Sequence, residues 1–210
     1  MTPLMFAVQS TEKTTKEVVE VLLNAGARLR TINHNRNTVL HLATSMEQPD
    51  IEIIKKLLAR PDVPINNQNN VGKTALHIVA SSYKSESIEL MPLLLSYPNI
   101  DVNIQDKDGA TPLHLAIPAP SQLSAMKSSE ALLSAKIALL LTHPKINLEI
   151  QDDGGKTALD KLGELPPSFQ KMVEHLKNNP EERKALQNNI IEDADTEYME
   201  EQTSDKGNSD

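Results

Sequence analysis

Apolar residues recur along the 210-residue chain in two alternating patterns, one short and one longer. The short pattern begins at a threonine, as in TVLHLAT from Thr38, TALHIVA from Thr74 and TPLHLAI from Thr111. In the longer pattern, as in KEVVEVLLNAG (16–26) and IEIIKKLLARP (51–61), apolar residues fall at positions i, i+1, i+4 and i+5. Side chains at this spacing share one face of a helix. The chain is therefore predicted to form pairs of helices, each with a buried face.

The short pattern returns five times at a nearly constant period. Its starting residues, separated by 36, 36, 37 and 46 positions, are Thr2, Thr38, Thr74, Thr111 and Thr157. A polar stretch precedes each of the last four of these threonines. In chain order the stretches read ARLRTINHNRN, VPINNQNNVGK, IDVNIQDKDGA and INLEIQDDGGK. Asn, Asp and Gly at such positions favour tight turns. A helix pair of this size cannot bury its apolar face alone, so each unit is expected to stack on its neighbours.

The helix pair, the polar loop and the threonine signature recur together in register, and over residues 1–178 the chain resembles ankyrin-repeat proteins. The resemblance implies an all-α fold, an ankyrin-repeat solenoid of stacked helix pairs with β-hairpin-like finger loops. The expected repeats are 1–32, 33–68, 69–105, 106–151 and a C-terminal cap at 152–178. The fourth repeat is lengthened by the segment 118–135.

The C-terminal part of the chain departs from this pattern. Asn179 followed by Pro180 is a favourable helix start, so an extra helix is predicted over 179–191. Residues 192–210 carry eight acidic side chains and one lysine, and too few apolar residues to offset the entropy cost of ordering. We expect a disordered acidic tail there.

Three residue types recur at fixed places in the signature and are expected to be structural. The threonines can cap the short helices with their hydroxyl groups. In the ankyrin family the histidine of the signature hydrogen-bonds the finger backbone, and the glycine before it supplies the positive φ of a tight turn. The positions are Thr38, His41, Thr74, His77, Thr111, His114, Gly72, Gly109 and Gly155. Arg36 stands where the other fingers have glycine, which implies either backbone strain or another turn type.

Composition narrows the classes of function. The net charge of −8 resides almost entirely in the tail, and a near-neutral body argues against nucleic-acid binding. The chain has no cysteine, which excludes thiolate chemistry, and no long apolar run, so no membrane span is expected. A cytoplasmic location is expected, with a nuclear one or a host cytosol as alternatives.

The recurring histidines and acids do not predict catalysis or a metal site. Zinc ligands lie about 2.0–2.1 Å from the metal, whereas equivalent residues on neighbouring helices lie about 8–10 Å apart. Asp106, Asp108, Asp152 and Asp153 are not followed by the glutamate that a calcium loop needs. An open array also lacks the enclosed pocket that acid–base chemistry favours. We therefore expect no enzyme activity and no cofactor.

The resemblance implies binding of a protein or peptide partner by a monomeric scaffold, adaptor or regulator. In the ankyrin family the finger tips and the exposed parts of the inner helices line a concave groove. The corresponding residues are His34, Asn35, Met46, Asn70, Lys73, Tyr83, Lys107, Asp108, Asp153 and Lys156. Tyr83, Met46 and His34 are the first choices for energetic hot spots.

Two other hypotheses stay open. The first treats the chain as a secreted effector of an intracellular bacterium that acts on host proteins, because ankyrin arrays with Glu-rich C-terminal segments occur among such effectors. The second treats it as a substrate of an asparaginyl hydroxylase. The candidate asparagines, each eight residues after a leucine, are Asn66, Asn103 and Asn147.

Overall fold

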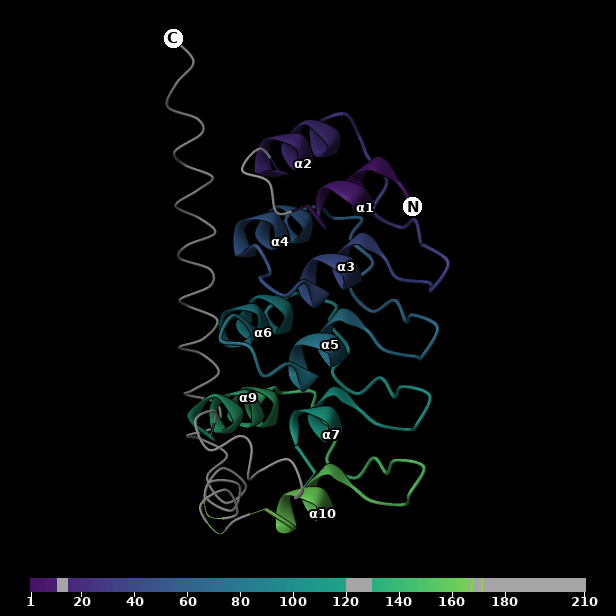
Figure 1. Ribbon diagram of the computed structural model, residues 1–210. Helices are drawn as coiled ribbons and strands as arrows, with labels where there is room; N and C mark the ends of the chain where they lie inside the picture. Colours follow the sequence, from purple (N-terminus) through teal and green to yellow (C-terminus); the bar gives the residue numbers. More distant parts are fainter. Residues whose placement is uncertain (11–14, 120–129, 166, 168–170, 172–210) are drawn as a thin grey trace.

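The computed structural model describes residues 1–10, 15–119, 130–165, 167 and 171. These residues form two columns of helices with a row of loops along one edge (Figure 1). The inner column consists of α1 (Pro3–Ala7), α3 (Val39–Ser45), α5 (Ala75–Ser81), α7 (Pro112–Ala116) and α10 (Ala158–Gly163). The outer column consists of α2 (Thr15–Asn24), α4 (Ile51–Leu58), α6 (Ser87–Leu95) and α9 (Glu130–Thr142).

The predicted all-α solenoid is confirmed. The described part of the chain contains no strand, and its only β contact is an isolated antiparallel bridge between Gln151 and Thr157. One hydrophobic core runs through the stack from Leu4 to Leu165 and is built from aliphatic side chains. The predicted helix at 179–191 and the predicted tail at 192–210 lie outside the described residues.

The inner helices α3, α5, α7 and α10 begin with a reciprocal cap, whereas at α1 only the Thr2 hydroxyl accepts a hydrogen bond, from the Met5 amide. The Thr38 hydroxyl accepts a hydrogen bond from the His41 amide at 3.5 Å, and the His41 Nδ1 accepts one from the Thr38 amide at 3.2 Å. The same pair of bonds starts α5 and α7. At α10 an aspartate replaces the histidine, and the Asp160 carboxylate accepts from the Thr157 amide at 2.8 Å. The threonine signature therefore sets where every inner helix of this kind begins.

The loops before these helices are called fingers here: finger 1 (28–37), finger 2 (64–73), finger 3 (101–110) and finger 4 (147–156). Each reverses direction at its tip with a backbone hydrogen bond of 2.8–3.0 Å between residues four apart. The tips of fingers 2, 3 and 4 use glycines with φ between 71° and 77°. Arg36 takes the same left-handed conformation in finger 1, with φ 57°. The departure from glycine therefore leaves the turn type unchanged and introduces strain, of the order of 1–2 kcal/mol.

Candidate interaction surface

The finger tips form one continuous edge because each finger is hydrogen-bonded to the next. In each case a backbone amide of the later finger donates to a backbone carbonyl of the earlier one. The bonds are Asn70 to Asn35 at 2.9 Å, Lys107 to Val71 at 3.2 Å and Asp153 to Asp108 at 3.0 Å. The backbone of the edge is thereby fixed along the row of loops (Figure 1), while the tip residues Asn35, Val71 and Asp108 are exposed.

The recurring histidines fasten fingers 2, 3 and 4 to the preceding inner helix. The Nε2 atoms of His41, His77 and His114 lie 2.9–3.1 Å from the carbonyl oxygens that end fingers 2, 3 and 4. Because Nδ1 accepts from a backbone amide, Nε2 must carry the proton and donate. Burial lowers the pKa of all three imidazoles, which favours this neutral form. Both ring nitrogens are occupied, so these histidines have no atom left for a metal or a ligand.

The lengthened fourth repeat does not disturb this clamp. His114 reaches the Lys156 carbonyl at 3.1 Å across 42 residues, whereas the equivalent contacts of His41 and His77 span 32 and 33 residues. The clamp is therefore kept although the segment between α7 and α9 makes this repeat longer than the others.

The residues predicted to bind a partner fall into two groups. Those on the finger edge are exposed, except for the half-buried Lys73, and they are His34, Asn35, Asn70, Lys73, Lys107, Asp108, Asp153 and Lys156. Met46 and Tyr83 instead follow the C-terminal ends of α3 and α5. An inner helix of seven residues is about 10 Å long, so the two groups lie at opposite ends of the inner helices.

Not every side chain on the edge is free. The Asn70 amide group donates to the His34 carbonyl at 3.1 Å, which adds a second link between fingers 1 and 2. The Lys156 ammonium group pairs with Glu164 at 2.5 Å. Asn70 and Lys156 therefore also contribute to the structure of the edge.

Two lysines that the sequence analysis did not single out join neighbouring repeats near Met46 and Tyr83. The Lys84 ammonium group donates to the Met46 carbonyl at 2.6 Å. The Lys136 ammonium group donates to the carbonyls of Ala80, at 2.8 Å, and Ser82 at the end of α5, where the helix dipole favours a positive charge. The position of a lysine inside the apolar run SAKIALLL was the available signal.

Lys136 is fully buried, and burial lowers its pKa to about 8. Its nitrogen lies 5.3 Å from the centre of the Tyr83 ring, a distance typical of a cation–π contact. Tyr83 is 39% exposed, so one part of its ring contacts the buried amine while another part is open to solvent. A partner that binds Tyr83 would therefore contact a residue that also supports the core.

The three candidate asparagines take part in contacts between repeats. The Asn66 side chain donates to the Asn99 carbonyl at 2.6 Å and accepts from the Asp101 amide at 2.9 Å. The Asn103 side chain donates to the Lys145 carbonyl at 2.7 Å and accepts from the Asn147 amide at 2.9 Å. The Asn147 side chain caps a local turn through the Glu149 amide.

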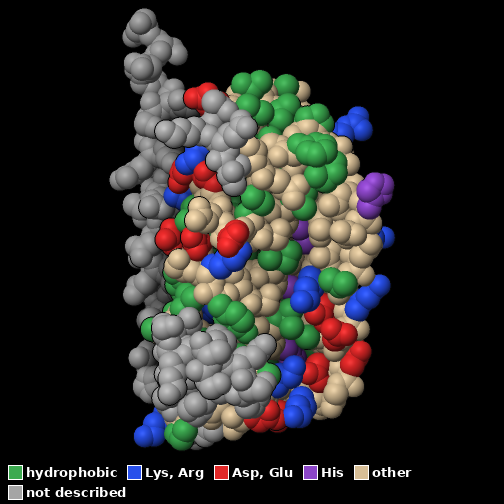
Figure 2. Space-filling view, in the orientation of Figure 1, with side chains coloured by type: hydrophobic (Ala, Val, Ile, Leu, Met, Phe, Trp, Pro, Cys, Tyr) green, Lys and Arg blue, Asp and Glu red, His purple; other side chains and the backbone are tan. Residues whose placement is uncertain are grey.

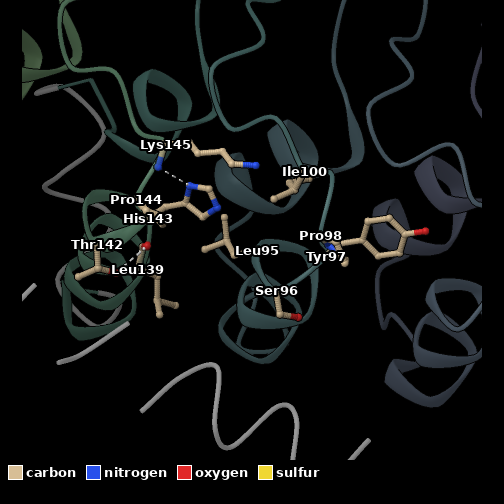
Figure 3. Close-up of a pocket in the computed structure, with 10 residues that line it drawn as sticks. All are labelled: Leu95, Ser96, Tyr97, Pro98, Ile100, Leu139, Thr142, His143, Pro144 and Lys145. Atoms are coloured by element: carbon tan, nitrogen blue, oxygen red, sulfur yellow. Dashed lines mark hydrogen bonds between the residues drawn. The ribbon is translucent and has the colours of Figure 1, made fainter. Parts of the chain in front are cut away.

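A hollow of about 190 Å³ lies between the loops that follow α6 and α9 (Figure 3). Its wall is mainly apolar, and the imidazole of His143 lies over Leu95. The His143 Nδ1 accepts from the Lys145 amide at 3.3 Å, and burial lowers the pKa of the ring. Among the described residues, no carboxylate lines the hollow, so they do not pair an acid with a base there.

Within the described ranges, no three histidine, aspartate or glutamate side chains are placed to hold a metal ion. Across the same ranges, no helix is both long and apolar enough to cross a membrane.

Residues 40–128 match the family model of ankyrin repeats in its three-copy form. The matched stretch begins in α3 and contains fingers 2 and 3. Among curated proteins, none matches the chain.

Proposed function

The chain is an ankyrin-repeat protein, and we propose that it is a non-catalytic module that binds a protein partner through its finger edge and the exposed ends of its inner helices. Ankyrin repeats generally mediate protein–protein interaction. The single observation that carries the proposal is the finger edge, in which successive tips are hydrogen-bonded into one line with outward-facing side chains.

A fixed edge suits recognition because the backbone is ordered before the partner arrives. Ordering a loop during binding costs free energy, and preorganisation removes that cost. Here each finger tip is held by its own turn and by a backbone hydrogen bond to a neighbouring finger, and the bases of fingers 2, 3 and 4 are each held by a histidine. Exposed Val71, Lys107 and Asp108 therefore present side chains in a defined register.

The arrangement of titratable groups supports a non-catalytic role. The three signature imidazoles use both nitrogens for structural hydrogen bonds, and no described residue in the wall of the His143 hollow is a carboxylate. A single monomer supplies the whole edge, so dimerisation is not needed to complete it. A cytoplasmic or nuclear location, where protein partners are abundant, fits this proposal.

The proposal is tested by a pull-down in which the finger edge alone is altered. The variant Val71→Glu/Lys107→Glu changes two exposed tip side chains that form no ion pair with the described residues. The matched control, Val21→Glu/Lys145→Glu, makes the same chemical changes on α2 and just after α9. We expect proteins retained from an extract of the producing cells to be lost with the finger variant and kept with the control. Equal retention by both would contradict the proposed site.

The effector hypothesis of the sequence analysis depends on the acidic C-terminal segment, which lies outside the described residues. The hydroxylase hypothesis concerns Asn66, Asn103 and Asn147, and it is compatible with protein binding. Because the first two side chains bridge neighbouring repeats, their modification would require these contacts to open. Mass spectrometry of the protein from its own cells, searching for one added oxygen on each asparagine, tests this hypothesis.

A further inference from the structure

The charges on the finger edge are divided between its two ends. Fingers 1 and 2 contain no carboxylate, and their charged residues are Arg28, Arg30, Arg36 and Lys73. Fingers 3 and 4 contain Asp101, Asp106, Asp108, Glu149, Asp152 and Asp153, beside Lys107 and Lys156. Figure 2 shows this division: basic and histidine side chains lie on the upper part of the finger edge, and acidic side chains lie beside basic ones on its lower part.

The three arginines of finger 1 are exposed. Among the described residues, none of the guanidinium groups of Arg28, Arg30 and Arg36 has a hydrogen-bond or ion-pair partner. Arg60, the remaining arginine of the described chain, pairs with Asp62 and donates to the Leu23 carbonyl. Finger 1 therefore concentrates the uncompensated guanidinium groups of the array.

In α2 and α4 of the outer column, in contrast, lysines form ion pairs with nearby acids. The three lysines of α2 and α4 are paired with acids of the same or the neighbouring helix pair: Lys16 with Asp50 at 3.3 Å, Lys55 with Glu52 at 3.7 Å and Lys56 with Glu20 at 2.5 Å. A solvated surface commonly intersperses charges of both signs in this way. The absence of any carboxylate between Glu20 and Glu47 sets finger 1 apart from that pattern.

We propose that fingers 1 and 2 bind an acidic segment of the protein partner, with the guanidinium groups of Arg28, Arg30 and Arg36 as the main anchors. This inference rests on the proposed function. A guanidinium group is planar and donates to a carboxylate through two parallel hydrogen bonds, which makes arginine well suited to recognise glutamate and aspartate side chains. Ile32, 48% exposed within the same finger, offers an apolar contact between the charges.

The far end of the edge favours a protein segment over a nucleic acid. A nucleic-acid strand carries a phosphate at every nucleotide and would meet Asp108, Asp153 and Glu149 if it continued along the fingers. Like charges placed opposite one another across an interface are unfavourable. A polypeptide can be acidic opposite fingers 1 and 2 and neutral or basic opposite fingers 3 and 4.

The test titrates the full-length protein with a short fluorescein-labelled peptide in which glutamate alternates with serine. Fluorescence anisotropy gives the affinity, and amide NMR spectra locate the site. The variant Arg28→Glu/Arg30→Glu is compared with Lys145→Glu/Lys171→Glu, which changes net charge equally through exposed residues away from fingers 1 and 2. The corresponding lysine–serine peptide and a single-stranded oligonucleotide are the competing probes.

We expect NMR shifts in fingers 1 and 2, a loss of affinity of at least about tenfold in the arginine variant and a much smaller change in the lysine variant. Binding should weaken when salt is raised from about 0.05 M to about 0.5 M, because exposed charges are screened. Equal losses in both variants, shifts centred on fingers 3 and 4, or tighter binding of the oligonucleotide at fingers 1 and 2 would each overturn the proposal.

Failure here is distinguishable from failure of the proposed function. If the Val71→Glu/Lys107→Glu variant loses its cellular partners but the glutamate peptide shows no preference for fingers 1 and 2, protein binding stands and the acidic-segment inference falls. If the peptide binds as expected but the pull-down is insensitive to the finger variant, the charge preference stands and the wider binding edge is refuted.

Discussion

Gly72→Ala probes the contact that turns separate fingers into one edge. Gly72 has a φ of 77°, which an alanine adopts only with strain. A Cβ atom on residue 72 would also lie 2.7 Å from the Lys107 nitrogen and 2.9 Å from the carbonyl carbon and Cα of Asp106. These atoms belong to the backbone of finger 3, so finger 3 must move to relieve the overlap.

The magnitude follows from two contributions. The left-handed conformation costs about 1–2 kcal/mol for a residue with a Cβ. Overpacking against a fixed backbone adds about 1–3 kcal/mol, so Gly72→Ala should lower the free energy of unfolding by about 2–5 kcal/mol. Arg36 already carries a Cβ at this position in finger 1 while the Asn70–Asn35 bond is kept, so the fingers can adjust and the fold should survive.

Gly155→Ala is the matched control. Gly155 has nearly the same φ, 73°, but a Cβ atom on this residue would have no described atom within 4 Å. The control should therefore lose only the conformational part, about 1–2 kcal/mol. Urea unfolding followed by circular dichroism measures the free energy of unfolding of both variants. The slope of that free energy against urea concentration is compared to check that the transition is unchanged. Equal losses at Gly72 and Gly155 would refute the close packing of successive fingers.

His77→Ala should cost roughly 1–3 kcal/mol, because the buried Ala110 carbonyl loses its donor, and urea unfolding checks it. Since burial lowers the pKa of His77 and its equivalents below 6.5, the unfolded chain binds protons more readily, and stability should fall as pH drops below about 6.5. Burial lowers the pKa of Lys136 to about 8, so the unfolded chain binds the proton more tightly and the free energy of unfolding should rise between pH 8 and pH 10.5. Unfolding curves recorded across that range should show this rise in the unaltered protein and not in Lys136→Met. Arg36→Gly should raise the free energy of unfolding by about 1 kcal/mol, because it removes the strain of the left-handed conformation. The urea midpoint should therefore increase, and an unchanged or lower midpoint would contradict that explanation.

The fold was predictable because its signal repeats. Each threonine start, apolar face and Asn- or Gly-rich turn is a local pattern, and five copies in register leave little room for another arrangement. Even the departure at Asp160 obeys the local rule, since a carboxylate completes the cap that His41 completes elsewhere. Local chemistry thus determined the helix starts and the turns.

The contacts between repeats were less predictable because their partners are distant in sequence. Lys136 meets the carbonyls of Ala80 and Ser82 across 56 and 54 residues, and the segment that lengthens the fourth repeat lies between them in the sequence. No periodic pattern relates a lysine in an outer helix to the end of an inner helix one repeat earlier. Likewise, the sequence showed arginines in finger 1, but only the three-dimensional structure shows that their guanidinium groups stay unpaired among the described residues.

Stability and recognition use different atoms of the same finger residues. The carbonyls of Asn35, Val71 and Asp108 accept hydrogen bonds from the next finger, while these residues remain exposed at the tips. A substitution at such a position can therefore change the surface offered to a partner without removing the bond that holds the edge together. The exceptions are Gly72 and Gly109, where a side chain would displace the neighbouring finger. The edge can therefore vary in charge from finger to finger, as it does between finger 1 and finger 4, while the array keeps one backbone geometry.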